Sequence, residues 1–163
     1  MTASGFTHLD RDGAARMVDV SGKDVTVRTA TASGRVRVSA QVVELLRGPG
    51  VAKGDALGVA RIAGIQGAKR TPDLVPLCHP IALHSVAVEL RVADDHVSIT
   101  SEVRTADRTG VEMEALTAVA VAALTLIDMV KSVDPAATIE DVRVETKSGG
   151  KTGDWTAPPR ADR

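Results

Sequence analysis

Apolar and polar residues alternate along several segments of the chain, which is the pattern of half-buried strands. In residues 25–38 an apolar residue or a threonine occupies every second position around Ser33 and Gly34. This segment predicts one strand or a hairpin. Residues 85–104 alternate on both sides of a short polar turn and form the clearest predicted hairpin. A last alternating segment, 139–146, predicts one further strand.

Three other segments have the spacing of helices. Residues 39–47 place apolar side chains at helical intervals, with Ser39 as the expected N-cap, and residues 53–69 are rich in alanine and glycine. Residues 110–133 are apolar nearly all round, which is typical of a helix buried on more than one side. The resulting order, β-α-α-β-β-α-β, predicts an α+β, ferredoxin-like fold: an antiparallel sheet with helices packed on one face.

The length of 163 residues fits one domain with a substantial core. We expect a single domain at 21–153, because no internal repeat or linker interrupts it. Residues 1–20 are polar without a clear period and are expected to form a flexible arm. Residues 154–163 are rich in proline and charge and are expected to form a flexible tail.

Composition argues against several classes of partner. One Phe, one Trp and no Tyr leave few platforms for stacking single-stranded nucleic acid, and a net charge of −1 does not attract duplex DNA. No apolar run has the length of a signal peptide, and the longest, 115–130, is shorter than the roughly 20 residues of a membrane span. Cys78 is the only cysteine, which suits a reducing compartment. We expect a cytoplasmic protein.

Two glutamates stand at the head of the long apolar helix. Thr109 and Glu112 have the spacing of a capping box, which would explain Glu112 without a functional role. Glu114 has no such explanation. On a helix, positions i and i+2 differ by about 200°, so Glu112 and Glu114 are not expected to face one ligand there. Either the helix begins near Glu114, or only one carboxylate is functional.

Asp128 and Lys131 lie near the tail of the same helix, at i and i+3, and share a face. On so apolar an element this pair is either partly desolvated, where pKa values shift, or a solvated helix end. Glu114 and Asp128 are roughly 21 Å apart along the axis and cannot reach one reacting atom within one chain. A shared site therefore requires two antiparallel copies of the helix across a two-fold interface.

Two prolines stiffen the segment VPLCHP, which places Cys78 and His79 in extended backbone. His79 is either a general acid or base, or a packed structural histidine. With one cysteine in the chain, the histidines match no standard zinc spacing. The sequence GGKT near the end of the chain is not a P-loop, because the first glycine of that motif would fall at Glu145.

Five stretches carry a resemblance to a known family: MVDVSGK, KGD, ARIAGIQGAKRTPDLVPLCHPI, TGVEMEALTAVAVAALTLIDMVK and KSGGKTG. Together they resemble the molybdenum cofactor biosynthesis protein C (MoaC) family of cyclic pyranopterin monophosphate synthases. The resemblance covers about residues 17–153. It implies that the domain at 21–153 is catalytic, and the motif positions show no departure from the family.

The resemblance implies a reaction and a set of site residues. Members of the family convert 3′,8-cyclo-7,8-dihydroguanosine 5′-triphosphate to the tricyclic pyranopterin with a cyclic phosphate, and pyrophosphate leaves. Carried onto this chain, the catalytic residues are Asp128, Lys131 and Lys53. The substrate-binding residues are Leu77, Cys78, His79, Glu112, Met113 and Glu114. Lys147 and Arg28 are weaker matches, as contacts to phosphate.

The resemblance also implies a homohexamer, a trimer of dimers with sites at the dimer interface. This agrees with the antiparallel helices expected from the rise per residue. No cofactor or dedicated metal cage is expected, although a magnesium ion travelling with the triphosphate is compatible with the chemistry. The alternative function is a nucleotide-binding sensor domain of the same fold without catalysis. Turnover of the cyclic triphosphate distinguishes the two.

Overall fold

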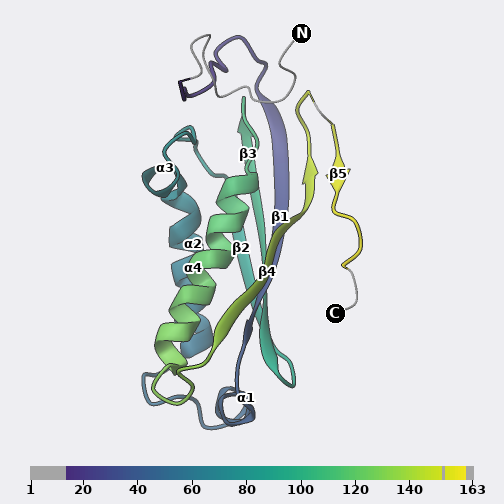
Figure 1. The fold of residues 1–163 in the computed structure, drawn as a ribbon. Helices are drawn as coiled ribbons and strands as arrows, with labels where there is room; N and C mark the ends of the chain where they lie inside the picture. The colour runs from purple at the N-terminus through teal and green to yellow at the C-terminus, as the bar shows by residue number, and fades with distance from the viewer. Residues whose placement is uncertain (1–13, 152, 161–163) are drawn as a thin grey trace.

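The sheet of this protein is antiparallel and carries its two long helices on one face (Figure 1). The computed structural model describes residues 14–151 and 153–160. The five strands, in the spatial order β2-β3-β1-β4-β5, are β1 (Thr26–Arg37), β2 (Ser85–Val92), β3 (His96–Asp107), β4 (Thr138–Ser148) and β5 (Trp155–Thr156). The first four follow the ferredoxin-like order, so the predicted α+β fold is confirmed.

The helices are α1 (Ala40–Arg47), α2 (Ala56–Lys69), α3 (Thr71–Leu74) and α4 (Glu112–Val130). α2 begins after Asp55, whose Oδ1 accepts a hydrogen bond from the N–H of Gly58 at 2.8 Å. Ser39 is the N-cap residue of α1, as expected, but its side chain makes no capping hydrogen bond. The Ser39 N–H instead donates to Oδ2 of Asp134 at 2.6 Å, which ties the start of α1 to the chain after α4.

β1 is one continuous strand and not a hairpin. Ser33 and Gly34 both pair with β3, opposite Thr100 and Ile99. A Cβ at Gly34 would lie 2.8 Å from Cγ1 of Val119 on α4. Gly34 therefore does not form a turn: its missing side chain lets α4 pack closely on the sheet.

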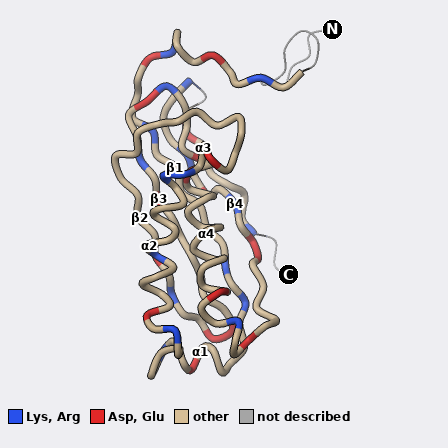
Figure 2. Tube along the Cα trace, turned by 90° about the vertical axis from the view of Figure 1, so that its left-hand side faces the viewer, with Lys and Arg blue, Asp and Glu red and all other residues tan. Residues whose placement is uncertain are grey.

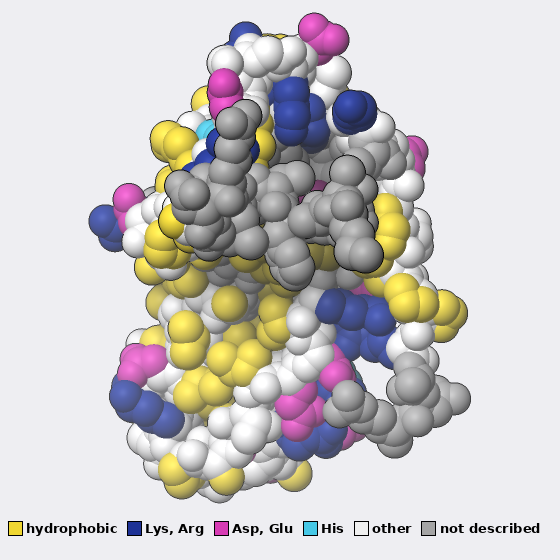
Figure 3. Space-filling model, turned by 45° about the horizontal axis from the view of Figure 1, so that its top comes forward, with side chains coloured by type: hydrophobic (Ala, Val, Ile, Leu, Met, Phe, Trp, Pro, Cys, Tyr) yellow, Lys and Arg dark blue, Asp and Glu magenta, His cyan; other side chains and the backbone are white. Residues whose placement is uncertain are grey.

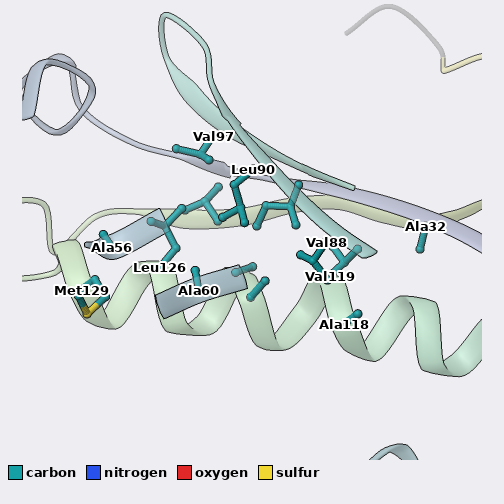
Figure 4. Close-up of a cluster of buried hydrophobic side chains, with 14 of the residues drawn as sticks. Ala32, Ala56, Ala60, Val88, Leu90, Val97, Ala118, Val119, Leu126 and Met129 are labelled. Atoms are coloured by element: carbon teal, nitrogen blue, oxygen red, sulfur yellow. The ribbon is translucent and has the colours of Figure 1, made fainter. Parts of the chain in front are cut away.

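The core between the sheet and the helices is built from aliphatic residues and alanine (Figure 4). Ile99, Leu126 and Val97 are fully buried, and small side chains on α2 and α4 let the two helices approach. Trp155, on the outermost strand, is exposed. The scarcity of aromatics thus shows directly in how the core is made.

By length and composition alone, α4 could cross a membrane. The apolar run 115–130 is too short for a membrane span, but this argument does not hold for the whole helix. The helix has 19 residues and a mean hydropathy of 1.8 in its best window. Half of that window is buried inside the protein, against the sheet and α2. This is the burial expected of a core helix.

The two ends of the chain are partly described. Of the arm predicted at residues 1–20, only 14–20 lie within the described residues. At the other end, Trp155 and Thr156 pair with β4 as the short strand β5, which the sequence pattern did not predict. The domain boundaries themselves stay a prediction.

Candidate active site

A cavity of about 380 Å³ opens at the N-terminal end of α4. It lies between the first turn of this helix, the loop after α3 and the segment before β1. Its lining includes every residue that the resemblance assigns to substrate binding: Leu77, Cys78, His79, Glu112, Met113 and Glu114. The fold thus brings together two short segments that are far apart in the sequence.

The loop that carries Cys78 and His79 is held against the segment before β1. Nε2 of His79 lies 2.7 Å from the carbonyl oxygen of Val18. Because a carbonyl oxygen only accepts, this bond places a proton on Nε2. Burial, and then the negative charge of Glu114, raise the pKa of Cys78, so that its sulfur is a thiol at neutral pH.

The head of α4 differs from the predicted capping box. The helix begins at Glu112 with Val111 as the N-cap residue, and no side chain caps it. The carboxylate of Glu112 instead lies 3.1 Å from Nζ of Lys147 at the end of β4. Glu112 and Glu114 both line the cavity, although side chains at i and i+2 of a helix point in different directions. They sit in the first turn, where the cavity extends around the helix end.

Glu114 is the buried carboxyl group of the site, with 3% of its surface exposed. Burial raises the pKa of Glu114 to about 7, and the nearby charge of Glu112 acts in the same direction. A hydrogen bond from its own backbone only partly opposes this shift. Glu114 can therefore hold or release a proton near neutral pH.

A smaller polar pocket of about 120 Å³ adjoins the first one. Arg28 of β1 and Lys147 of β4 both line it, together with Glu112 and residues 148–149. The Nε of Arg28 donates to the carbonyl oxygen of Asp107 at 2.9 Å, which orients its guanidinium. Arg28 and Lys147, the two weaker matches of the resemblance, thus lie together beside the larger cavity.

The three residues assigned to catalysis form a separate cluster at the other end of α4. Nζ of Lys131 lies 2.7 Å from Oδ1 of Asp128, and Nζ of Lys53 lies 3.1 Å from Oδ2. Hydrogen bonds from Lys131 and then Lys53 lower the pKa of Asp128 below its ordinary value of 3.8. The carboxylate is therefore ionised and held between two ammonium groups.

This cluster is exposed in the single chain. The Asp128 side chain has a relative exposure of 57%, so within one protomer the pair is a solvated helix end, the second of the two alternatives that the sequence left open. Figure 2 shows the charged positions beside the end of α4 that lies next to α1. Fourteen residues of helix, or roughly 21 Å, separate Asp128 from the buried Glu114. The predicted site residues therefore form two groups within one chain.

The sequence of the whole domain decides the family. The sequence model of the MoaC family matches residues 17–150. The chain belongs to the MoaC family. The match covers both groups of site residues and every element from β1 to β4.

Relatives of this MoaC family chain are similar over nearly their full lengths. Cyclic pyranopterin monophosphate synthase of Streptomyces coelicolor is 73% identical over 151 residues, 93% of this chain and 89% of the relative. The protein of the same name from Corynebacterium glutamicum is 55% identical over 94% of this chain and 98% of the relative. Cyclic pyranopterin monophosphate synthase 2 of Mycobacterium tuberculosis is 59% identical over 93% of this chain and 90% of the relative.

Several residues of the cavity were not found from the sequence. Val18, Val20 and Lys23 line it from the segment before β1, which we expected to be largely an arm. Thr109 and Gly110 line it beside the head of α4. Val18, Val20 and Lys23 lie in the motif MVDVSGK, which supported the resemblance but gave no role to any of its residues.

No set of three His, Cys, Asp or Glu side chains within residues 14–151 and 153–160 is arranged to hold a metal ion. The acidic groups of the site are spread over the two ends of α4, and the nearest partners of Asp128 are lysines. The absence of a resident metal stays a prediction.

Proposed function

We propose that this chain is a cytoplasmic enzyme of molybdenum cofactor biosynthesis. It converts 3′,8-cyclo-7,8-dihydroguanosine 5′-triphosphate to cyclic pyranopterin monophosphate and releases pyrophosphate. The observation that carries the proposal is its similarity to relatives named for this product, up to 73% identity over 93% of the chain. The two groups of side chains at the ends of α4 supply the acids, bases and cations that such a reaction requires.

The active site, in this proposal, is shared between two protomers. Two copies of α4 run antiparallel, and the Asp128 cluster of one protomer completes the Glu114 cavity of the other. Large apolar side chains on the helical layer support this arrangement: Ile62 of α2 is 63% exposed and Leu124 of α4 is 61% exposed. Figure 3 shows hydrophobic side chains gathered on the face that carries the helices. A trimer of such dimers gives the homohexamer.

Asp128 and the two lysines beside it act on the phosphate chain. A hydroxyl oxygen of the sugar attacks the α-phosphorus, and the bond from that phosphorus to the oxygen bridging to the β-phosphate breaks. Asp128 takes the proton of the attacking hydroxyl, since it is ionised between its two lysines. Lys53 and Lys131 offset the negative charge that develops as pyrophosphate leaves. A magnesium ion bound to the triphosphate would act alongside them.

The acidic groups act on the ring system. Glu114 has a pKa of about 7 and can donate a proton to a ring nitrogen or oxygen as the rings open and close. The imidazole of His79 presents Nδ1 to the same substrate, and this nitrogen accepts a proton when it carries none. Cys78 stays a thiol and contributes shape and a weak hydrogen bond.

An assay of turnover tests the proposal. The protein is incubated with the cyclic triphosphate, and both pyrophosphate and pterin product are measured. We expect turnover by the wild type and a loss of about 10²- to 10⁴-fold in Asp128→Ala, because a general base is removed. Asp94→Ala is the matched control, since Asp94 is also an exposed aspartate in an ion pair, with Arg47 at 2.9 Å, but lies in the turn between β2 and β3 and contributes to neither group of site residues.

Two results would contradict the proposal in different ways. Wild-type protein that binds the cyclic triphosphate without forming product would favour a sensor domain over an enzyme. Undiminished turnover by Asp128→Ala would retain the enzyme and reject Asp128 as its base.

A further inference from the structure

The chain after β4 folds back along the edge of the sheet. Trp155 and Thr156 of β5 pair with Lys147 and Thr146 of β4. The N–H of Ala157 then donates to the carbonyl oxygen of Glu145 at 2.8 Å. We name residues 153–160 the C-terminal strap. Its backbone pairs with the end of β4 and forms the outermost strand of the sheet.

Arg160 anchors this strap on the face of the sheet that carries no helices. Its guanidinium lies 2.8 Å from Oε1 of Glu145, donates to the hydroxyl oxygen of Ser33, and lies 3.5 Å from Oδ2 of Asp141. A second arginine assists, because NH1 of Arg143 donates to the carbonyl oxygen of Pro158 at 3.0 Å. The strap is thus tied to β1 and to β4 by side chains as well as by backbone.

The environment of Glu145 shows how strongly this anchor is held. Burial acts to raise the pKa of Glu145, but hydrogen bonds from Arg143, Ser33 and Arg160 outweigh it and lower the pKa to about 2. Glu145 is therefore ionised throughout the working pH range. Its bonds to Arg143 and Arg160 are of the stronger class, because both the donors and the acceptor are ionised.

The same stretch of β4 faces the proposed active site on its other side. A shift in register near Thr31 and Ala32 places Glu145 at a bulge, so that Glu145 and Lys147 reach opposite faces of the sheet. Lys147 pairs opposite the buried Ala30 and approaches Glu112 of α4 at 3.1 Å. Anything that fixes the backbone at Glu145 and Thr146 therefore fixes the direction of Lys147.

We propose that Arg160 is a positioning residue: by holding the C-terminal strap against β4, it sets Lys147 in the polar pocket beside Arg28 and Glu112. The inference rests on the proposed function in one respect, namely that phosphate groups of the substrate occupy this pocket. Arg160 itself contacts no group of the pocket. It acts through the strand pairing of Trp155 and Thr156.

The test uses Trp155, the only tryptophan of a chain that has no tyrosine. Its emission reports on β5 alone. In Arg160→Ala we expect a red shift of this emission and faster hydrogen exchange at residues 145–148, with an unchanged far-UV circular dichroism spectrum. KM for the cyclic triphosphate rises about 10-fold and kcat changes little, since a misplaced phosphate contact weakens uniform binding.

Two variants make the result specific. Arg160→Lys keeps the charge beside Glu145 but not the fork, so its emission and KM fall between those of the wild type and Arg160→Ala. Arg91→Ala is the matched control, because Arg91 pairs with the exposed Glu89 at 2.9 Å on the far edge strand, β2. It leaves the emission, the exchange and KM unchanged.

The outcomes separate this inference from the proposed function. Unchanged emission and exchange in Arg160→Ala, or a released strap with an unchanged KM, overturn the positioning role while the enzyme stands. If the wild type has no turnover, the proposed function fails. The positioning role is then decided by the Kd for inorganic pyrophosphate, which rises in Arg160→Ala if the role is correct and is unchanged if it is not.

Discussion

Two carboxyl groups on α4 have opposite environments. Glu114 is buried, and burial raises its pKa to about 7. Asp128 is exposed between Lys131 and Lys53, which lower its pKa below 3.8. In the proposed reaction, this separation of pKa values makes Glu114 the acid and Asp128 the base. In this protein the division follows from where each residue lies on a single helix.

Glu114→Gln tests the state of the buried carboxyl group. The pKa of Glu114 is raised from 4.5 to about 7 in the folded protein, so the folded state holds a proton that the unfolded chain releases. Wild-type stability therefore falls as pH rises from about 4.5 to about 7, by roughly 3 kcal/mol. The neutral glutamine removes this fall. Melting temperatures at pH 5 and pH 8 measure it, and parallel profiles for both proteins would contradict the assignment.

At the residue scale, sequence indicated the two carboxyl groups of α4 with shifted pKa values, but it did not predict the partner of Glu112. The charges on an apolar helix indicated Glu114 and Asp128 as unusual, and the structure gives both shifted pKa values. The capping box at Thr109 failed because the helix starts later, and Glu112 pairs with Lys147 instead. That partner is more than thirty residues away and depends on the path of β4, which no local pattern encodes.

The packing of α2 on α4 sets the shape of the helical layer. Gly64 of α2 faces the backbone of α4, and a Cβ at this position would lie 2.8 Å from the carbonyl oxygen of Ala118. Backbone atoms in the middle of a long helix cannot move aside as a side chain can. The absence of a side chain at Gly64 therefore determines how closely the two helices approach.

Gly64→Ala is expected to destabilise the protein by about 1–3 kcal/mol, the cost of overpacking a core. The added methyl group has to push α2 away from α4 and open the contacts around it. Gly22→Ala is the control, because a Cβ at Gly22 meets nothing within 4 Å. Urea denaturation measures both free energies of unfolding. Equal stability of the two variants would show that the helices are not in close contact at Gly64.

Elements with a sustained period were predictable from sequence, and irregular ones were not. The alternation across 85–104 and the apolar run after Gly110 correspond to β2, β3 and α4. The interpretation of residues 25–38 stayed open between a strand and a hairpin, because Ser33 and Gly34 look like a turn until α4 is seen above them. β5 has two residues, too few to show a period.

At the scale of the whole molecule, the two ends of α4 define the central question. Within one chain the Glu114 cavity and the Asp128 cluster are roughly 21 Å apart. The family and the sheet could be predicted from the sequence, because family motifs and alternating apolar residues are found along the whole domain. Whether two protomers share a site depends on a surface between chains, and the proposal rests on the exposed apolar side chains of the helical layer.

Complementation between two inactive variants tests the shared site most directly. Glu114→Gln and Asp128→Asn proteins are unfolded and refolded together at equal concentration, and turnover of the cyclic triphosphate is measured. Half of the randomly formed dimers are mixed, and one of the two sites in each mixed dimer has both wild-type residues. We therefore predict recovery of about a quarter of wild-type turnover. No recovery above the two parent variants would contradict a site shared between protomers.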